Sequence, residues 1–167
     1  TFYYFIFDSG ASLRIGVEPG DKLIGSVNAS GSLTDYEITG SELSEQLLAL
    51  YQPVLESSRV IDSLDEYRKL SNDPDSNYIQ IETRHYKFLE NRYHNHKKEI
   101  LKVMAMDSSN LSNVFGFFQK VAAAPIFSSK EEDHIFFREF GDVIIEKHPN
   151  HPLARIFILE RKRMLGQ

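Results

Sequence analysis

Cysteine and tryptophan are both missing from this sequence of 167 residues. Without cysteine the chain has no disulfide, no thiolate nucleophile, no CxxC redox pair and no thiolate ligand for zinc. No apolar run approaches the roughly 20 residues of a membrane-spanning helix, and no segment has the pattern of a secretory signal peptide. Positive charge is also scarce, since 19 Lys and Arg against 24 Asp and Glu give a net charge of −5. A duplex nucleic-acid binder needs a basic face, so this balance argues against nucleic acid as a partner.

The residues that are present indicate an ordinary globular chain. The composition is 41% hydrophobic and 26% charged, which is typical of a packed domain. Twelve Phe and eight Tyr supply large apolar surfaces for a core. A chain of this length can form such a core without disulfides.

Residues 1–40 have the pattern of antiparallel β-structure. The Glu-Pro-Gly-Asp segment at 18–21 fits a turn with Gly20 at positive φ, and the short connections predict that neighbouring strands pair antiparallel. The chain begins with a dense apolar strand, which natural domains rarely do. We therefore expect residues 1–40 to be the C-terminal part of a β-domain whose upstream strands are absent. Strands are predicted at residues 2–7, 11–18, 23–27 and 34–39.

After Gly40 the apolar spacing changes from two residues to about 3.6, which predicts helices. We expect an α+β fold, in which the small antiparallel sheet precedes a helical domain of four to five helices over residues 41–167. The first two helices are long and should form an antiparallel hairpin. Pro53 should kink or interrupt the first, and residues 72–74 should end it and start the second. Helices are predicted at residues 41–70, 75–106, 108–121, from Ser128 or Ser129 to His148, and 152–164.

The helical spacing also predicts which aromatic side chains face inward. Phe117 and Phe137 lie outside the main apolar faces of the third and fourth predicted helices. We expect them to form a second apolar surface, for example one that contacts an absent domain. Two capping boxes, Ser128 with Glu131 and Ser129 with Glu132, are predicted at the start of the fourth helix. The side chains expected to face inward include Tyr86, Leu89, Tyr93, Phe115, Phe118, Ile135, Phe136 and Phe140.

Histidines and acids on the second helix form the best candidate for a metal site. His94 and His96 have His85, Glu90 and Glu99 nearby, and zinc favours imidazole and carboxylate ligands. The spacing does not suit a metal site, because His94 and His96 point to different sides of a helix. Glu90 and His94 do share a face, but two ligands are too few. We interpret the cluster as a solvated helix face and predict no metal and no cofactor.

A second histidine pair lies at His148 and His151. The pair could form a metal-binding loop, but a joint between two helices is the favoured interpretation. In that joint His148 complements the negative end of the preceding helix, and Asn150 caps the next.

Two acidic clusters are candidates for general acid–base pairs, one at residues 62–66 and one at 131–133. Asp62, Asp65 and Glu66 are expected on an exposed helix face, and residues 131–133 in a first helical turn, where negative charge is stabilising. No serine has a nucleophile-elbow pattern and the glycines form no phosphate-binding loop. We predict no catalytic residue and no enzyme activity for this chain.

Several short motifs follow one another along the chain in a fixed order. The EPGD turn at 18–21 is followed by YEITGS at 36–41, by a helical hairpin, and by Asn110-Leu111-Ser112 before an aromatic helix. Phe117-Phe118-Gln119, Phe127, Asp133, Phe137 and His148-Pro149 come next. This order resembles the N-terminal region of the thioredoxin-like TlpA/ResA-type thiol–disulfide oxidoreductases of the Bacteroidota.

The resemblance implies an accessory region, because the family's catalytic CxxC lies in a thioredoxin fold that this chain lacks. Family members are exported, so a periplasmic or cell-envelope address is implied. We expect a non-catalytic interaction module whose partner is a downstream thioredoxin-like domain or another protein, with a homodimer also open. The alternative is a free-standing periplasmic or surface module that binds a glycan, lipid or peptide. An open aromatic-lined pocket between sheet and helices would favour that alternative, and a filled interface would oppose it.

Overall fold

The computed structural model describes residues 1–8, 10, 12–28, 35–70 and 78–167. The α+β prediction is confirmed, because short antiparallel sheets at the N-terminus precede five helices. The strands are β1 (Phe2–Ile6), β2 (Ser12–Gly16), β3 (Ile24–Asn28), β4 (Asp35–Thr39), β5 (Lys120–Val121) and β6 (Ala124–Pro125). The helices are α1 (Glu42–Leu70), α2 (Tyr78–Met106), α3 (Asn113–Phe117), α4 (Glu131–Lys147) and α5 (Pro152–Met164).

The N-terminal strands form two antiparallel hairpins. In one, Phe2 of β1 lies opposite Gly16 of β2; in the other, Ile24 of β3 lies opposite Thr39 of β4. Among the described strands β2 and β3 do not pair, so two small sheets replace the single sheet that the short connections predicted. The intervening segment holds the predicted turn, in which the Asp21 amide donates to Glu18 O at 3.2 Å and Gly20 has φ 102°.

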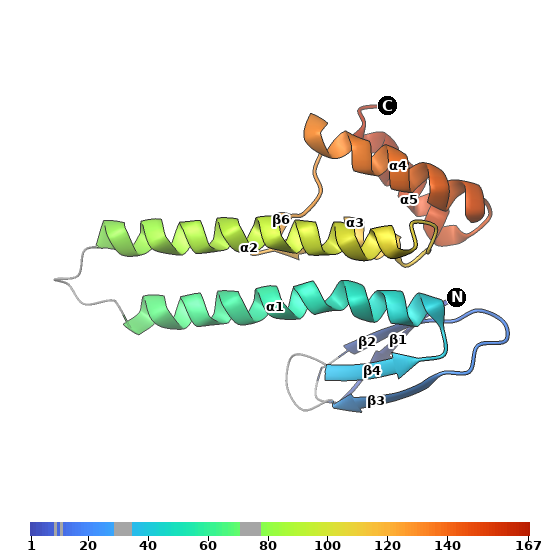
Figure 1. Cartoon of the computed structure of the whole chain (residues 1–167), viewed down its shortest axis with the longest axis horizontal. Helices are drawn as coiled ribbons and strands as arrows, with labels where there is room; N and C mark the ends of the chain where they lie inside the picture. The colour runs from blue at the N-terminus through green and yellow to red at the C-terminus, as the bar shows by residue number, and fades with distance from the viewer. Residues whose placement is uncertain (9, 11, 29–34, 71–77) are drawn as a thin grey trace.

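Both hairpins pack against the first half of α1 (Figure 1). Leu13 of β2 and Tyr36 and Ile38 of β4 are buried against it and form a small core of their own. The backbone of Gly16 approaches α1 closely, and the hydroxyls of Ser41 and Ser44 donate to Gly16 O at 2.8 and 2.7 Å. A Cβ at Gly16 would lie 2.7 Å from that of Leu43, so this junction requires glycine.

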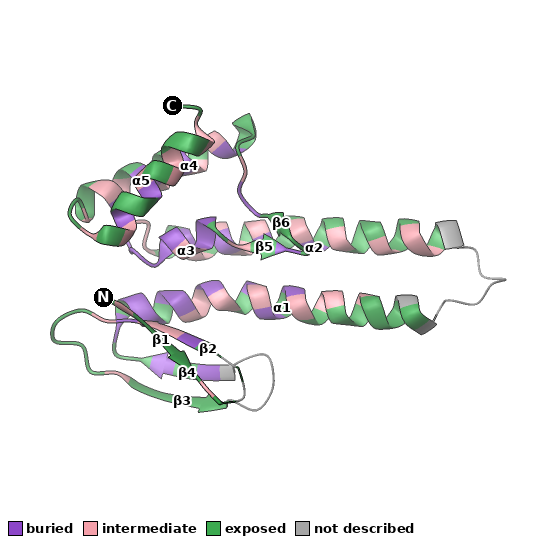
Figure 2. Cartoon of the chain, turned by 180° about the vertical axis from the view of Figure 1, so that it is seen from behind, coloured by how far each residue is buried: buried purple, intermediate pink, exposed green. Residues whose placement is uncertain are grey.

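Helices α1 and α2 form the predicted antiparallel hairpin and lie side by side along the long axis of the molecule (Figure 1). Each is 29 residues long. Pro53 lies inside α1, so the predicted interruption of the helix there is wrong. Leu50 and Leu55, on either side of Pro53, are buried. The turn predicted at residues 72–74 lies outside the described residues. Figure 2 shows that buried residues gather in the half of the hairpin nearest the strands and α3, while the far half is mostly exposed or intermediate.

Phenylalanines between α3, α4 and α5 form the centre of the main core. The ring of Phe117 lies 4.9–5.0 Å from those of Phe127, Phe137 and Phe157, and all four are buried. The expectation that Phe117 and Phe137 cover a second surface is therefore wrong. Phe118 is instead 42% exposed, because α3 ends at Phe117 and the helical spacing does not continue past it. Among the other side chains expected to face inward, Tyr86 and Ile135 are also exposed.

A small β-hairpin replaces the end of the predicted third helix. Strands β5 and β6 pair through Val121 and Ala124, and the two residues between them, Ala122 and Ala123, have φ of 46° and 70°. Positive φ at both central residues is the geometry of a tight hairpin turn. Tyr93 fixes the hairpin to α2, because its hydroxyl donates to Pro125 O at 2.9 Å and lies 3.1 Å from Ile126 O.

The residues predicted to cap the N-termini of α4 and α5 are not the ones that do so. Lys130 is the N-cap of α4, and Ser128 contacts the carboxylate of Asp133 instead of forming a capping box. Helix α5 has the predicted bounds, but its N-cap is His151, whose Nδ1 accepts from the Leu153 amide at 3.1 Å, and not Asn150. His148 ends α4 as expected, with its amide donating to Ile144 O.

Candidate functional site, an aromatic cleft

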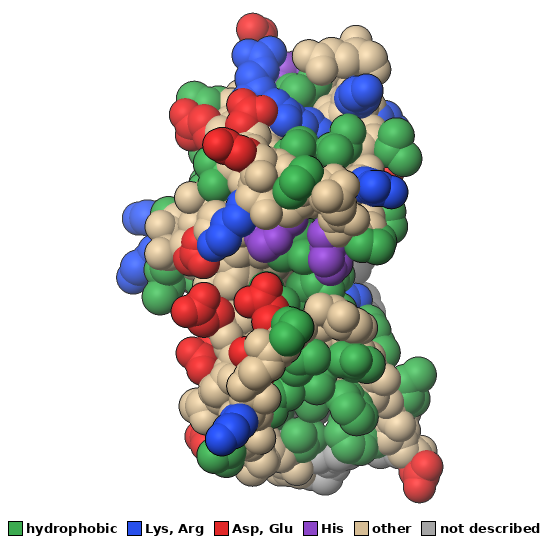
Figure 3. Space-filling model, turned by 90° about the vertical axis from the view of Figure 1, so that its right-hand side faces the viewer, with side chains coloured by type: hydrophobic (Ala, Val, Ile, Leu, Met, Phe, Trp, Pro, Cys, Tyr) green, Lys and Arg blue, Asp and Glu red, His purple; other side chains and the backbone are tan. Residues whose placement is uncertain are grey.

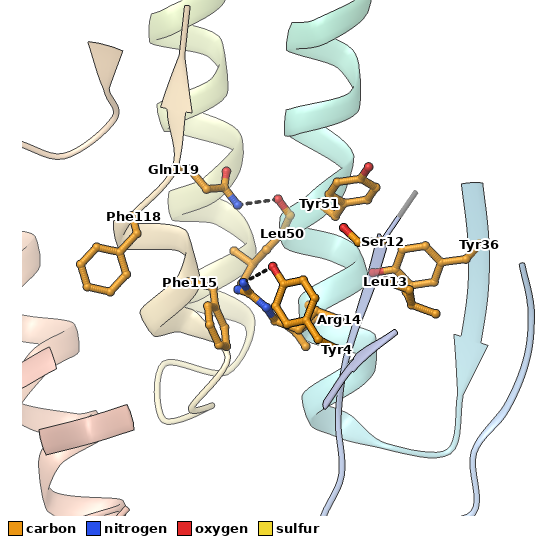
Figure 4. A pocket seen from close by; sticks show the side chains of 11 residues that line it. Tyr4, Ser12, Leu13, Arg14, Tyr36, Leu50, Tyr51, Phe115, Phe118 and Gln119 are labelled. Atoms are coloured by element: carbon orange, nitrogen blue, oxygen red, sulfur yellow. Dashed lines mark hydrogen bonds between the residues drawn. The ribbon is translucent and has the colours of Figure 1, made fainter. Parts of the chain in front are cut away.

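An open cleft of about 500 Å³ lies between the N-terminal hairpins and the helices (Figure 4). Strands β1, β2 and β4 form one wall, α1 forms the floor, and α3 with the residues after it forms the other wall. Such a volume is within the usual range of small-molecule sites. The lining residues are Tyr4, Ser12, Leu13, Arg14, Tyr36, Leu47, Leu50, Tyr51, Phe115, Phe118 and Gln119.

The sequence places these side chains through simple spacings. Tyr4 and Arg14 are opposite each other in the β1–β2 register, so their side chains are neighbours on one face. On α1, Leu47 and Leu50 or Tyr51 are three and four residues apart and share one helix face. Phe115 lies in α3.

Arg14 is the one charged residue in the lining. Its guanidinium lies 4.0 Å from the ring centroid of Phe115 and 4.6 Å from that of Tyr4, and one N–H donates to the Tyr4 hydroxyl. Contacts of this kind between a cation and aromatic rings are attractive. Within the described residues no carboxylate lies within ion-pair distance of Arg14. The guanidinium is thus held in place by rings and not by an acid.

Two tyrosines line the far side of the cleft. The rings of Tyr36 and Tyr51 lie 6.0 Å apart. Burial, with a smaller contribution from Tyr51, raises the pKa of Tyr36 to about 12. Its hydroxyl therefore stays protonated at neutral pH and can serve as a hydrogen-bond donor or acceptor.

Gln119 connects the cleft to a buried polar network between α1 and α2. Its amide nitrogen donates to Leu50 O at 2.9 Å, and its amide oxygen accepts from Nε2 of His96 at 2.7 Å. With Nε2 protonated, Nδ1 of His96 accepts from the Ser57 hydroxyl at 2.7 Å, and Ser57 in turn accepts from Nε of Arg92 at 2.9 Å. The network satisfies a neutral imidazole on both nitrogens, and burial lowers the pKa of His96 below its usual 6.5.

The side chains of the predicted histidine cluster are dispersed. His96 is fully buried in the network just described, so its placement on a solvated helix face is wrong. His94 is exposed on the other side of α2, as its spacing predicted. Glu99 pairs with Arg92, and His85 lies 4.0 Å from Asp65 of α1. Over the described part of the chain, no group of three or more potential ligands is placed to hold a metal ion.

The acidic clusters and the helix joint are likewise separate from the cleft. Glu131 and Glu132 are exposed in the first turn of α4, but Asp133 is buried and pairs with Lys97 of α2. Asp62, Asp65 and Glu66 are exposed on α1, as expected. In the joint after α4, Nε2 of His148 lies 2.9 Å from Ser109 O, and His151 caps α5.

The sequence alone did not identify Arg14 or the cleft as a site. The one signal was a charged residue between the apolar Leu13 and Ile15 of a short strand. Nothing local indicates that the ring above Arg14 belongs to Phe115, which is far away in the chain.

Comparison with protein-family models, with curated proteins and with solved structures found no match for this chain. In the described residues no helix combines the length and apolar character needed to cross a membrane.

Proposed function

We propose that this chain is a non-catalytic binding module whose ligand occupies the aromatic cleft. The observation that carries the proposal is an open cleft lined by five aromatic rings, between the N-terminal hairpins and the helices. A pocket with mostly apolar walls and a few placed polar groups is the usual form of a small-molecule site.

The chemistry of the lining supports binding over catalysis. General acid–base catalysis uses a group whose pKa lies near the working pH. The cleft is lined by one guanidinium and three phenols, together with Ser12 and Gln119, and none of its lining residues is Asp, Glu or His. Such a set can orient a ligand through hydrogen bonds and ring contacts.

Ligand-observed NMR tests this proposal with a library of short glycans, fatty acids and tripeptides. Phe118 lines the cleft and is 42% exposed, so Phe118→Ala should remove ligand contacts without opening the core. Phe88 is 51% exposed on α2 outside the cleft, and Phe88→Ala is the matched control. We expect binders that lose affinity at least about tenfold in Phe118→Ala and are unchanged in Phe88→Ala. An absence of binders, or equal binding by both variants, would contradict the proposal.

A second candidate function is the accessory role in an exported thiol–disulfide oxidoreductase of the periplasm or cell envelope. The observation that favours it is the exposure of large apolar side chains on the N-terminal hairpins, namely Tyr3, Phe5 and Ile6 of β1 and Ile24 and Val27 of β3. Large exposed apolar patches often mark interaction surfaces. Figure 3 shows hydrophobic side chains gathered on the lower part of one face, over these hairpins.

The accessory role predicts what the parent gene encodes on both sides of this segment. Sequencing the gene on both sides of the segment should find upstream β-strands and a CxxC-containing thioredoxin segment after Gln167. A stop codon directly after Gln167 would contradict this candidate and leave the binding module as the function.

A further inference from the structure

We infer that the ligand of the aromatic cleft bears a carboxylate on an apolar body, with the carboxylate bound by Arg14. This inference rests on the proposed function and specifies the chemical class of the ligand. A carboxylate could come from a small organic acid or from the C-terminus of a peptide, and the experiment below separates the two.

Charge is the first argument. The chain has a net charge of −5, yet the cleft contains one cation and its lining residues include no acid. An arginine withdrawn from solvent often pairs with a carboxylate. Arg92 and Arg161 do so with Glu99 and Asp142. Arg14 is half-buried without such a partner among the described residues, so a ligand anion would complete the same kind of pair.

The orientation of Arg14 is the second argument. Phe115 and Tyr4 lie against its guanidinium, at 4.0 and 4.6 Å from their centroids, and the Tyr4 hydroxyl accepts one of its N–H donors (Figure 4). A guanidinium has five N–H donors in a planar fork that matches the two oxygens of a carboxylate. Because ring contacts already fix the side chain, less rotamer entropy is lost when it binds a ligand.

The remaining walls define the body of the ligand. Leu13, Leu47 and Leu50 add aliphatic surface to the rings. A phosphate dianion would need several cations or backbone amides around it, and the cleft has a single cation. A neutral sugar would leave Arg14 without an anion. A monocarboxylate with an aromatic or aliphatic body satisfies both the guanidinium and the rings.

The test compares acids with their uncharged amides by isothermal titration of the whole chain. The probes are 4-phenylbutanoate and 4-phenylbutanamide, and the tripeptide Ala-Ala-Phe with a free or an amidated C-terminus. Charge-assisted hydrogen bonds should make at least one acid bind about tenfold tighter than its amide. Tighter binding of phenylbutanoate indicates a small acid, and tighter binding of the free tripeptide indicates a C-terminus.

Arg14→Gln is the diagnostic variant, and Arg155→Gln, at an exposed position of α5, makes the same charge change away from the cleft. We expect the preference for acid over amide to fall to within about twofold in Arg14→Gln and to persist in Arg155→Gln. Circular dichroism confirms that both variants are folded, and Arg14→Lys, which keeps the charge but not the fork, should retain part of the preference.

The outcomes separate the two proposals. If acid and amide bind equally to the wild type, or if Arg14→Gln keeps the preference, the carboxylate inference is wrong and the binding module stands. If none of the probes binds and the wider library also yields no binder, the proposed function itself fails.

Discussion

Ser57 provides a sharp test of the buried network beside the cleft. Its hydroxyl is buried between α1 and α2, where it donates to Nδ1 of His96 and accepts from Nε of Arg92. Ser57→Ala removes both bonds and leaves two buried polar atoms without these partners. Arg92 keeps its ion pair with Glu99, so the main loss falls on His96.

The expected cost follows from these partners. Leaving a buried acceptor without a hydrogen bond costs about 1–3 kcal/mol of stability. Alanine has a higher helix propensity than serine, which offsets at most about 0.5 kcal/mol of that cost. We therefore expect Ser57→Ala to lower the free energy of unfolding by about 2 kcal/mol. For a domain of ordinary stability, about 5–15 kcal/mol, that is a large fraction.

Urea unfolding followed by circular dichroism at 222 nm measures this cost, since the chain has no tryptophan and is mostly helical. Ser63→Ala, at an exposed position of the same helix, is the matched control and should change stability by no more than about 0.5 kcal/mol. If the two variants unfold at the same urea concentration, the network of Ser57, His96 and Gln119 does not hold the hairpin as described.

Two further predictions concern stability. Burial lowers the pKa of His96 below 6.5. Below that pH the imidazole therefore binds a proton more readily in the unfolded chain than in the folded chain. Unfolding free energy should change little just above neutral pH and should fall as pH decreases through 6.5, the ordinary pKa of histidine. His96→Gln should reduce that slope more than His94→Gln, at an exposed position of the same helix, and equal slopes in the two variants would refute the assignment. In the β5–β6 turn, Ala123 has φ 70°, so Ala123→Gly should stabilise by about 1 kcal/mol in the same urea assay, and a loss of stability would contradict that backbone.

Much of the fold followed from local patterns because those patterns are strong. The helical hairpin has a long apolar stripe on each helix, and α5 begins at Pro152 and ends after the basic residues Arg161 and Arg163, which are ordinary start and stop signals. The turn at 18–21 was predictable because proline and glycine each have a fixed role there.

The rest depended on tertiary contacts that spacing does not reveal. Alanine favours helices, yet Ala122 and Ala123 turn the chain, since burial of Val121 and Ile126 and the bonds from Tyr93 hold the β5–β6 hairpin. Phe117, the last residue of α3, is buried, whereas Phe118 follows the end of the helix and is exposed.

The candidate site was the least predictable part. The cleft combines strands, α1 and α3, and each of its residues has an ordinary local explanation. A charged residue in a short strand is usually solvated, and only the contact with the ring of Phe115 shows that Arg14 lies in a cleft. The sequence did indicate a globular chain rich in aromatic residues, but which rings would line an open cleft was decided by where α3 ends.

Mapping of ligand-induced chemical shifts tests the central claim most directly. Isotope-labelled protein would be titrated with 4-phenylbutanoate and followed by two-dimensional ¹⁵N–¹H NMR. The account predicts that the Nε–H of Arg14, the side-chain amide of Gln119 and the backbone amides around Phe115 shift first and furthest. Shifts confined to the far end of the helical hairpin, around Tyr67 and Phe88, would show that the aromatic cleft is not the binding site.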